Sequence, residues 1–333
     1  MGDIKVWKTT RHTVYRTFLA LLAISIAVLG SASAQQAAPP AERLSFSLPD
    51  DVDVRHATIW SEGTRMAANV YSPKAVTGKL PTVIMAYGWG GTMQRVREEA
   101  AAFAAAGYLV VMFDYRGWGE SDSRVILAAP EPAERPSNRF TAEVVELREI
   151  LDPLAEVTDL SNVVHWVQAE TQSDTSRIGI WGTSFGGSIA AAVAGYDHRI
   201  RAVHAQVVPL ELRVLDRAGY AEGTKRARGE LGYPQPGEIV VAGLRGAPIT
   251  ENFLRFSPAQ AMNLAPDCAI QIVLAGNEQL FDTKSSIAAY EAFKGAKKNL
   301  VIVPDIGHYD VYDKARHQAR QLALAWFDRN LKP

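Results

Sequence analysis

The sequence predicts an α/β fold with a mainly parallel, doubly wound sheet. Short, fully apolar runs recur along the chain and alternate with segments of helical pattern. Between one such run and an alanine-rich segment stands a Gly-x-Ser-x-Gly motif, at residues 182–186. Strands that are apolar on both faces are typical of parallel sheets, whose connecting helices cover both faces.

The strands of this sheet are expected in two groups. Residues 54–60 and 66–71 alternate between apolar and polar side chains around a turn at residues 61–64, which predicts an antiparallel hairpin at the sheet edge. The buried strands that follow are predicted over residues 82–87, 109–113, 178–181, 202–208, 269–274 and 300–303. Since parallel sheets bind ligands at the carboxyl ends of their strands, residues just after these runs are candidates for a site.

Helices are expected between these strands. Residues 98–106 are rich in alanine and end at Gly107, a common helix terminator. Further helices are predicted over residues 161–170, over the small residues after Ser184, and over the amphipathic residues 314–331. The alternation of strand and helix is what predicts the parallel topology.

Two segments interrupt this alternation. Residues 123–155 carry Pro130, Pro132, Pro136 and many charges, which indicates a surface excursion. Residues 209–266, approximately, separate two predicted strands and contain enough apolar residues to pack. We expect this second segment to form a small cap over the active site; the alternative is a solvated structural insertion.

The N-terminus has the features of a signal peptide at residues 1–34. Lys5, Lys8, Arg11 and Arg16 precede an apolar run at residues 18–30, and Ala-Ser-Ala follows at residues 32–34. The apolar run is shorter than the roughly 20 residues that span a bilayer. We therefore expect an exported protein, periplasmic or secreted, with one mature domain over residues 35–333 and no stable membrane span after cleavage. An uncleaved membrane anchor is the alternative.

Composition narrows the possible partners. The formal net charge is −1, so no basic excess points to nucleic acid. Cys268 is the only cysteine, which excludes an intramolecular disulfide, and its apolar neighbours indicate an inert buried thiol. No Cys/His cluster has the spacing of zinc ligands, so neither a metal nor another cofactor is expected.

Ser184 is the candidate nucleophile. A short apolar run, the motif and a small-residue helix form the strand–turn–helix context of a nucleophile elbow, in which the serine occupies a sharp turn. Gly182 and Gly186 allow the strand and the helix to approach closely. The alternative is an ordinary glycine-rich turn with a capping serine.

His308 is the candidate base, because it alone among the histidines directly follows a predicted parallel strand and is preceded by a flexible Gly307. An acid is expected after the preceding strand to orient the imidazole. Glu278 comes soonest after that strand and is preferred, and Asp282 is the alternate acid. The order Ser184, Glu278, His308 is the nucleophile–acid–base order of such elbows.

The tetrahedral intermediate also needs N–H donors for its oxyanion. The amide of Phe185, directly after the nucleophile, is one candidate. The second is the Trp89 amide, in a glycine-rich turn after residues 82–87. The alternative for Trp89 is a packing aromatic; both roles are compatible, since the donor is main chain and the indole could line the acyl pocket.

These residues resemble the α/β-hydrolase superfamily over nearly the whole mature chain. The resemblance is carried by Gly-Thr-Ser-Phe-Gly (182–186), Tyr-Gly-Trp-Gly-Gly (87–91), Asp-Tyr-Arg-Gly-Trp-Gly-Glu-Ser (114–121) and Gly-His (307–308). Residues 61–73 look like the opening hairpin of the X-Pro dipeptidyl-peptidase and cocaine-esterase-like branch, and residues 149–154 and 166–187 are similar to dienelactone-hydrolase-like members.

The resemblance implies a serine hydrolase with a Ser-His-Glu triad that acts on a small ester or a short peptide. Prolyl-oligopeptidase-like enzymes have a tyrosine donor where this chain has Trp89. The chain is also too short for the extra domains of the peptidase branch. Both departures favour a carboxylesterase. The alternatives are an X-Pro-type or small peptidase or amidase, and a non-catalytic binding protein that kept the fold.

Overall fold

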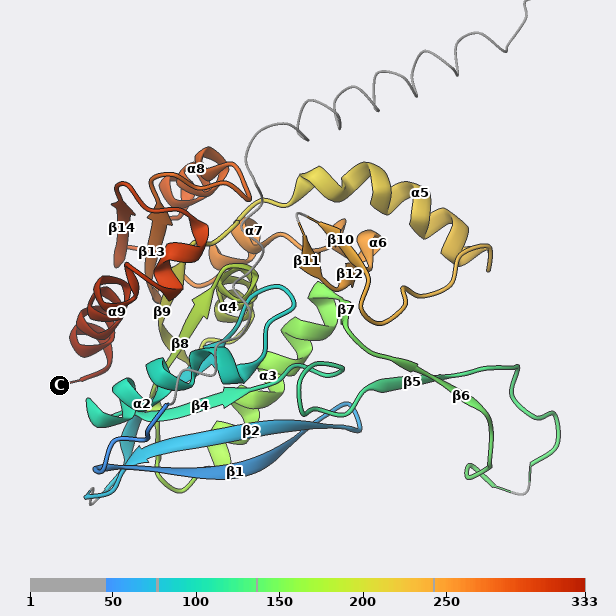
Figure 1. The fold of residues 1–333 in the computed structure, drawn as a ribbon, viewed down its shortest axis with the longest axis horizontal. Helices are drawn as coiled ribbons and strands as arrows, with labels where there is room; N and C mark the ends of the chain where they lie inside the picture. Colours follow the sequence, from blue (N-terminus) through green and yellow to red (C-terminus); the bar gives the residue numbers. More distant parts are fainter. Residues whose placement is uncertain (1–45, 76–77, 136, 242, 333) are drawn as a thin grey trace, which may run out of the picture. The chain divides into compact units, whose positions relative to one another are not determined.

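An eight-stranded sheet forms the centre of the fold, with the strand order β1–β2–β4–β3–β8–β9–β13–β14 (Figure 1). The structure is a computed structural model that describes residues 46–75, 78–135, 137–241 and 243–332. The predicted signal peptide at residues 1–34 lies outside the described residues. The strands are β1 (Val52–Ser61), β2 (Thr64–Pro73), β3 (Leu80–Ala86), β4 (Leu109–Phe113), β8 (Ser173–Thr183), β9 (Ile200–Gln206), β13 (Ala269–Ala275) and β14 (Lys298–Val303).

The pairing of these strands confirms the predicted fold class. β1 pairs antiparallel with β2, and β2 pairs antiparallel with β4. All other neighbours in the sheet are parallel. The hairpin therefore lies at one edge of a mainly parallel sheet, as the alternating and fully apolar runs predict.

Helices cover both faces of the sheet, and the alternation of side chains along β8 shows which helix lies on which face. Ile178 and Ile180 belong to the core cluster formed with α3 (Pro153–Ala169) and α4 (Phe185–Tyr196). A side chain at Gly179, between them, would collide with Phe327 of α9 (Arg316–Leu331). Since successive residues of a strand point to opposite faces, α9 covers the face opposite α3 and α4.

α2 (Arg97–Ala105) lies on the face of α9. The ring of Phe103 in α2 is 5.9 Å from the ring of Phe327 in α9. The remaining crossover helix, α8 (Thr283–Ala292), connects β13 to β14 and was not predicted from the sequence. None of the helices in the described residues is long and apolar enough to cross a membrane.

The described part of the predicted surface excursion contains three short strands, and the helix after it starts earlier in the structure than the sequence predicts. β5 (Arg124–Leu127) and β6 (Val144–Leu147) form an exposed antiparallel hairpin (Figure 1), followed by β7 (Ile150–Leu151). α3 begins at Pro153 rather than at residue 161. The cause is local, because the Asp152 side chain accepts hydrogen bonds from the N–H groups of Leu154 and Ala155 and proline is favoured at the first helical position.

The segment predicted as a cap, residues 209–266, forms short elements packed on the main body. They are η2 (Arg213–Leu215), α5 (Asp216–Ala227), β10 (Ile239–Val241), β11 (Leu244–Arg245), β12 (Ala247–Pro248), α6 (Thr250–Phe253) and α7 (Pro258–Met262). β12 pairs in parallel with β7, and α7 packs on α4. The insertion is thus tied to the helix that follows the candidate nucleophile.

Candidate active site

Ser184 occupies the turn between β8, which ends at Thr183, and α4, which begins at Phe185. Its backbone has φ 53° and ψ −128°, a strained conformation for a residue with a side chain. The Ser184 N–H donates to Gln206 O of β9 at 2.8 Å, which holds the turn on the neighbouring strand. This is the sharp turn that the motif predicts.

The glycines of the motif are required by contact distances. A Cβ on Gly182 would lie 2.7 Å from Gly186 O, and a Cβ on Gly186 would lie 2.4 Å from Ala86 O. Any side chain there would push α4 away from β8 or β3. The two glycines therefore let the helix start directly above the strand ends and leave the serine at the tip of the turn.

His308 lies between Ser184 and Glu278. Its Nε2 is 3.1 Å from Ser184 Oγ, and its Nδ1 is 2.9 Å from both carboxylate oxygens of Glu278. The side chains of His308 and Glu278 are 3% and 2% exposed, so these contacts are shielded from water. The structure thus brings together the three side chains that the sequence analysis named as nucleophile, base and acid.

The alternate acid, Asp282, has a different partner. Its carboxylate caps α8 by accepting from the Lys284 N–H at 3.0 Å, and the residue is exposed. Glu278 is instead fixed in the loop after β13, where its Oε1 accepts from the N–H groups of Gln279 and Leu280 at 3.0 and 2.9 Å. The contact with His308 is therefore made by Glu278.

Gln279 is a residue at the site that sequence reasoning missed. Its Oε1 accepts from the His308 N–H at 3.1 Å, so the loop that carries Glu278 also holds the backbone of His308. A Cβ on Gly307 would lie 2.4 Å from the Gln279 side chain. The signal in the sequence was the position of Gln279, directly after the preferred acid.

Both candidate oxyanion donors belong to residues at or next to a close contact with Ser184. Phe185 is the first residue of α4, where a backbone N–H has no intrahelical partner. The loop after β3 also passes very close to Ser184, since a Cβ on Gly88 would be only 2.8 Å from Ser184 Cβ. Trp89 follows Gly88, so its main chain lies next to this close approach.

The Trp89 side chain belongs to a packed aromatic group. Its ring centroid lies 5.7 Å from that of Phe185 and 6.2 Å from that of Phe253, and its Nε1–H donates to Gly246 O at 2.9 Å. Phe256 also contacts Phe185, with ring centroids 5.8 Å apart. Residues 246–256 of the insertion therefore pack on the residues that flank Ser184.

The run at residues 114–121 has a structural role in this fold. The buried Asp114 carboxylate accepts from the N–H groups of Met93 and Glu120 at 2.7 and 2.9 Å. Burial raises the pKa of Asp114, and the two N–H groups partly oppose this. The run thus ties the loop after β4 to η1 (Met93–Val96), which follows the loop of Trp89.

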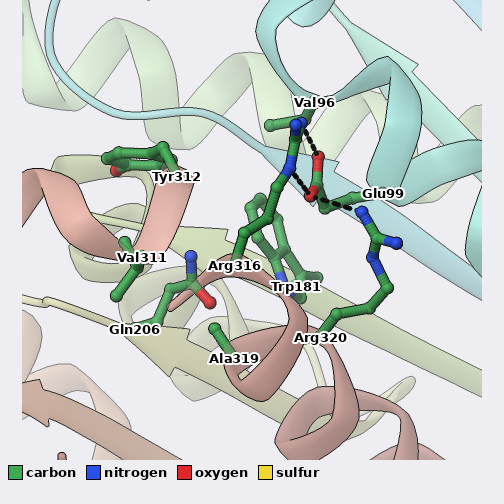
Figure 2. Close-up of a pocket in the computed structure, with 9 residues that line it drawn as sticks. All are labelled: Val96, Glu99, Trp181, Gln206, Val311, Tyr312, Arg316, Ala319 and Arg320. Carbon is green, nitrogen blue, oxygen red and sulfur yellow. Dashed lines mark hydrogen bonds and ion pairs between the residues drawn. The ribbon is translucent and has the colours of Figure 1, made fainter. Parts of the chain in front are cut away.

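A small cavity lies on the α2/α9 face of the sheet (Figure 2). Its volume is about 10 Å³, enough for about one water molecule and too small for a substrate. Beside it the Glu99 carboxylate accepts from Arg316 at 2.6 and 3.0 Å and from Arg320 at 3.1 Å (Figure 2). These ion pairs hold α2 against α9. Among the described residues, no group of three or more His, Cys, Asp or Glu side chains is arranged to hold a metal ion.

Comparisons with known proteins agree with this architecture. A hypothetical protein from Pseudomonas aeruginosa superposes with a TM-score of 0.67 at 19% identity, covering 90% of this chain and 99% of that chain. A putative dienelactone hydrolase from Klebsiella pneumoniae subsp. pneumoniae superposes with a TM-score of 0.56 at 18% identity, covering 83% and 98%. At these identities the likeness shows the fold, which is that of the α/β hydrolases.

Sequence comparisons find similarity to one enzyme family over part of the chain. Residues 62–220 match the family model of the X-Pro dipeptidyl-peptidase (S15) family, which begins in the opening hairpin and extends past Ser184. The chain is also 25% identical to an uncharacterized 31.7 kDa protein from the traX-finO intergenic region of Escherichia coli, over 76% of this chain and 92% of that protein. The predicted resemblance to the X-Pro dipeptidyl-peptidase and dienelactone-hydrolase-like branch is confirmed.

Proposed function

We propose that this protein is an exported serine hydrolase that cleaves carboxylic esters through a Ser184–His308–Glu278 triad. One observation carries the proposal: His308 Nε2 is 3.1 Å from Ser184 Oγ while its Nδ1 is 2.9 Å from Glu278. This geometry lets a neutral imidazole accept the serine proton at one nitrogen and donate from the other. No metal or other cofactor takes part in the proposed reaction.

In the acylation half-reaction, Ser184 Oγ attacks the carbonyl carbon of the ester, and its proton moves to His308 Nε2. Glu278 accepts a hydrogen bond from Nδ1–H and stabilises the imidazolium that forms. The amides of Phe185 and Trp89 donate to the oxyanion of the tetrahedral intermediate. The intermediate then collapses and expels the alcohol oxygen, which takes the proton from Nε2 and leaves an acyl ester on Ser184.

In the deacylation half-reaction, water attacks the acyl carbon and gives one proton to His308 Nε2. Collapse of the second tetrahedral intermediate breaks the bond to Ser184 Oγ, which recovers that proton. The carboxylic acid leaves, and the three side chains return to their starting protonation states. The overall reaction consumes one water molecule per ester.

Esters are favoured over amides by the position of Trp89. Its indole N–H donates to Gly246 O, so the side chain is committed to packing on the insertion and supplies no additional donor to an oxyanion. An ester needs less assistance than an amide because an alkoxide leaves more readily than an amine. The family match over residues 62–220 favours the second candidate, an X-Pro-type or small peptidase. Rates with p-nitrophenyl butyrate and with an X-Pro p-nitroanilide decide between them, and dominant anilide cleavage would overturn the choice of esters.

The experiment that tests the proposed chemistry is hydrolysis of p-nitrophenyl acetate or butyrate by a Ser184→Ala variant. We expect kcat/KM to fall by a factor of about 10⁵ or more, as for loss of other activated serine nucleophiles. Ser176→Ala is the matched control, because Ser176 lies in β8, the strand that leads to Ser184, and its hydroxyl donates a hydrogen bond to the Asp174 carboxylate. Undiminished turnover in Ser184→Ala would refute the triad and leave a binding protein or another nucleophile.

Export is proposed from the basic and apolar pattern of residues 1–34. Fractionation of cells that express the full chain, with N-terminal sequencing of the product, tests it. Recovery outside the cytoplasm with a new N-terminus near Gln35 is expected. Recovery of an uncleaved chain in the cytoplasm would contradict it.

A further inference from the structure

The turn that carries His308 is fixed from two sides. Glu278 and Gln279 hold it from the β13 side, through the imidazole and through the His308 N–H. His308 begins η3 (His308–Tyr312), and Tyr312 ends it. The second attachment is at Tyr312.

Tyr312 is joined to the strand that carries the nucleophile. Its hydroxyl oxygen is 2.6 Å from Thr183 Oγ1, and Thr183 directly precedes Ser184. Tyr312 and Gln206 both line the small cavity on this face of the sheet (Figure 2). The Tyr87 ring lies 5.9 Å from the Tyr312 ring. Burial raises the pKa of the Tyr312 hydroxyl well above its usual value, so the group stays a neutral O–H near neutral pH.

Thr183 is itself the end of a buried chain of polar side chains that crosses three strands. Gln206 Nε2 donates to Thr183 Oγ1 at 3.3 Å, Gln206 Oε1 is 3.3 Å from His204 Nε2, and His204 Nδ1 is 2.7 Å from Gln271 Oε1. These four residues are 0 to 3% exposed. A donor or acceptor that loses its partner here has no water to replace it, and an unpaired buried polar group lowers the free energy of unfolding.

The direction of this chain follows from the protonation state of His204. Burial lowers its pKa to about 4, so at neutral pH the imidazole is neutral and donates from only one nitrogen. If Gln206 donates to Thr183, its carbonyl accepts from His204 Nε2–H. His204 Nδ1 then carries no proton and accepts, so the Gln271 side-chain amide must turn by 180° about its Cγ–Cδ bond to donate from its NH₂ group. Thr183 Oγ1 accepts from Gln206 and has one O–H left to share with Tyr312.

We propose that Tyr312 is a positioning residue for His308, acting through its hydrogen bond to Thr183. The bond links the last residue of the base-carrying turn to the residue before the nucleophile. It fixes the separation of His308 Nε2 and Ser184 Oγ independently of the acid loop. This role rests on the proposed function of Ser184 and His308.

The test is Tyr312→Phe, which removes the hydroxyl and keeps the ring. We expect kcat for p-nitrophenyl butyrate to fall by about fivefold with KM unchanged, the effect of losing about one net hydrogen bond in the transition state. Tyr108→Phe is the matched control. Tyr108 is fully buried whereas Tyr312 is partly buried, and the Tyr108 hydroxyl donates to Asp328 at 2.8 Å on the same face of the sheet. It should lower the melting temperature and leave kcat unchanged.

Two further variants separate positioning from folding. Thr183→Val removes the Thr183 hydroxyl, which is the other partner of this bond, and should lower kcat. Thr183→Ser keeps a hydroxyl at this position and should keep kcat near the wild-type value. Thr183→Val also removes the acceptor of Gln206 Nε2, but the bond between Thr183 and Tyr312 is lost in both single variants. The Tyr312→Phe/Thr183→Val double variant should therefore lose little more kcat than Thr183→Val alone. Unchanged kcat in a folded Tyr312→Phe would overturn the inference while wild-type activity upholds the proposed function. An inactive wild type would instead refute the proposed function itself.

Discussion

The substitution Glu278→Gln tests the acid most sharply, because the surrounding hydrogen bonds dictate what the new amide does. Glu278 Oε1 accepts from two backbone N–H groups, at Gln279 and Leu280. The glutamine carbonyl must therefore stay at the Oε1 position, and its NH₂ takes the place of Oε2; both positions are 2.9 Å from His308 Nδ1, so the NH₂ competes with the carbonyl for that nitrogen. An N–H donor there favours the tautomer with the proton on Nε2, which cannot accept the proton of Ser184.

The expected loss follows from this wrong tautomer. We expect kcat for p-nitrophenyl butyrate to fall by a factor of about 10³ to 10⁴, with the fold retained, as for other triads whose acid becomes an amide. Asp282→Asn is the matched control, since that side chain caps α8 and is exposed. It should change kcat by less than about twofold, and the asparagine can still cap the helix. Near-normal activity in Glu278→Gln, or a larger loss in Asp282→Asn, would refute the assignment.

Three other outcomes are expected. Gly88→Ala should lower kcat by about 10 to 100-fold, because its Cβ would lie 2.8 Å from Ser184 Cβ and must displace the nucleophile or the loop; unaltered ester hydrolysis would contradict this. Stability should fall by up to about 3 kcal/mol as the pH falls from about 6.5 to about 4, because burial lowers the pKa of His204 to about 4 and the unfolded chain then binds the extra proton. Urea unfolding of the wild type and of His204→Gln over this pH range checks it. If the free energy of unfolding falls with pH equally in both proteins, His204 is not the cause. Burial raises the pKa of the Cys268 thiol to about 12, so iodoacetamide at pH 8 should leave the native thiol unmodified and label it only in denaturant; rapid labelling of native protein would disprove its burial.

Most of the sheet could be predicted because its strands carry strong local signals. The central strands are continuous apolar runs, and the hairpin alternates as a half-buried pair of strands should. α8 was missed because it has no such signal. Among its residues only Ser286 is buried, and the apolar residues that face the core, Ile287, Ala289 and Tyr290, are partly buried, so its apolar face is short. The early start of α3 was signalled by Asp152 and Pro153, but it lies in a segment whose prolines and charges indicate a loop.

Within the candidate site, too, the residues with local sequence signals could be predicted, and the contacts between distant residues could not. Ser184 stands in a local strand–turn–helix pattern, and His308 and Glu278 follow apolar runs, so each could be named from its own neighbourhood. The choice between Glu278 and Asp282 could not be derived, since it depends on which carboxylate reaches the imidazole in space. The bond between Tyr312 and Thr183 joins residues 129 positions apart, and nothing in either local sequence indicates the other.

The central claim is that Ser184 is an activated nucleophile. Its most direct test is the intact mass of the purified protein after reaction with a fluorophosphonate, followed by peptide mapping. The account predicts one adduct per chain, located on Ser184, and none in Ser184→Ala or after acid denaturation. An unlabelled wild type, or an adduct on another residue that persists in Ser184→Ala, would contradict it.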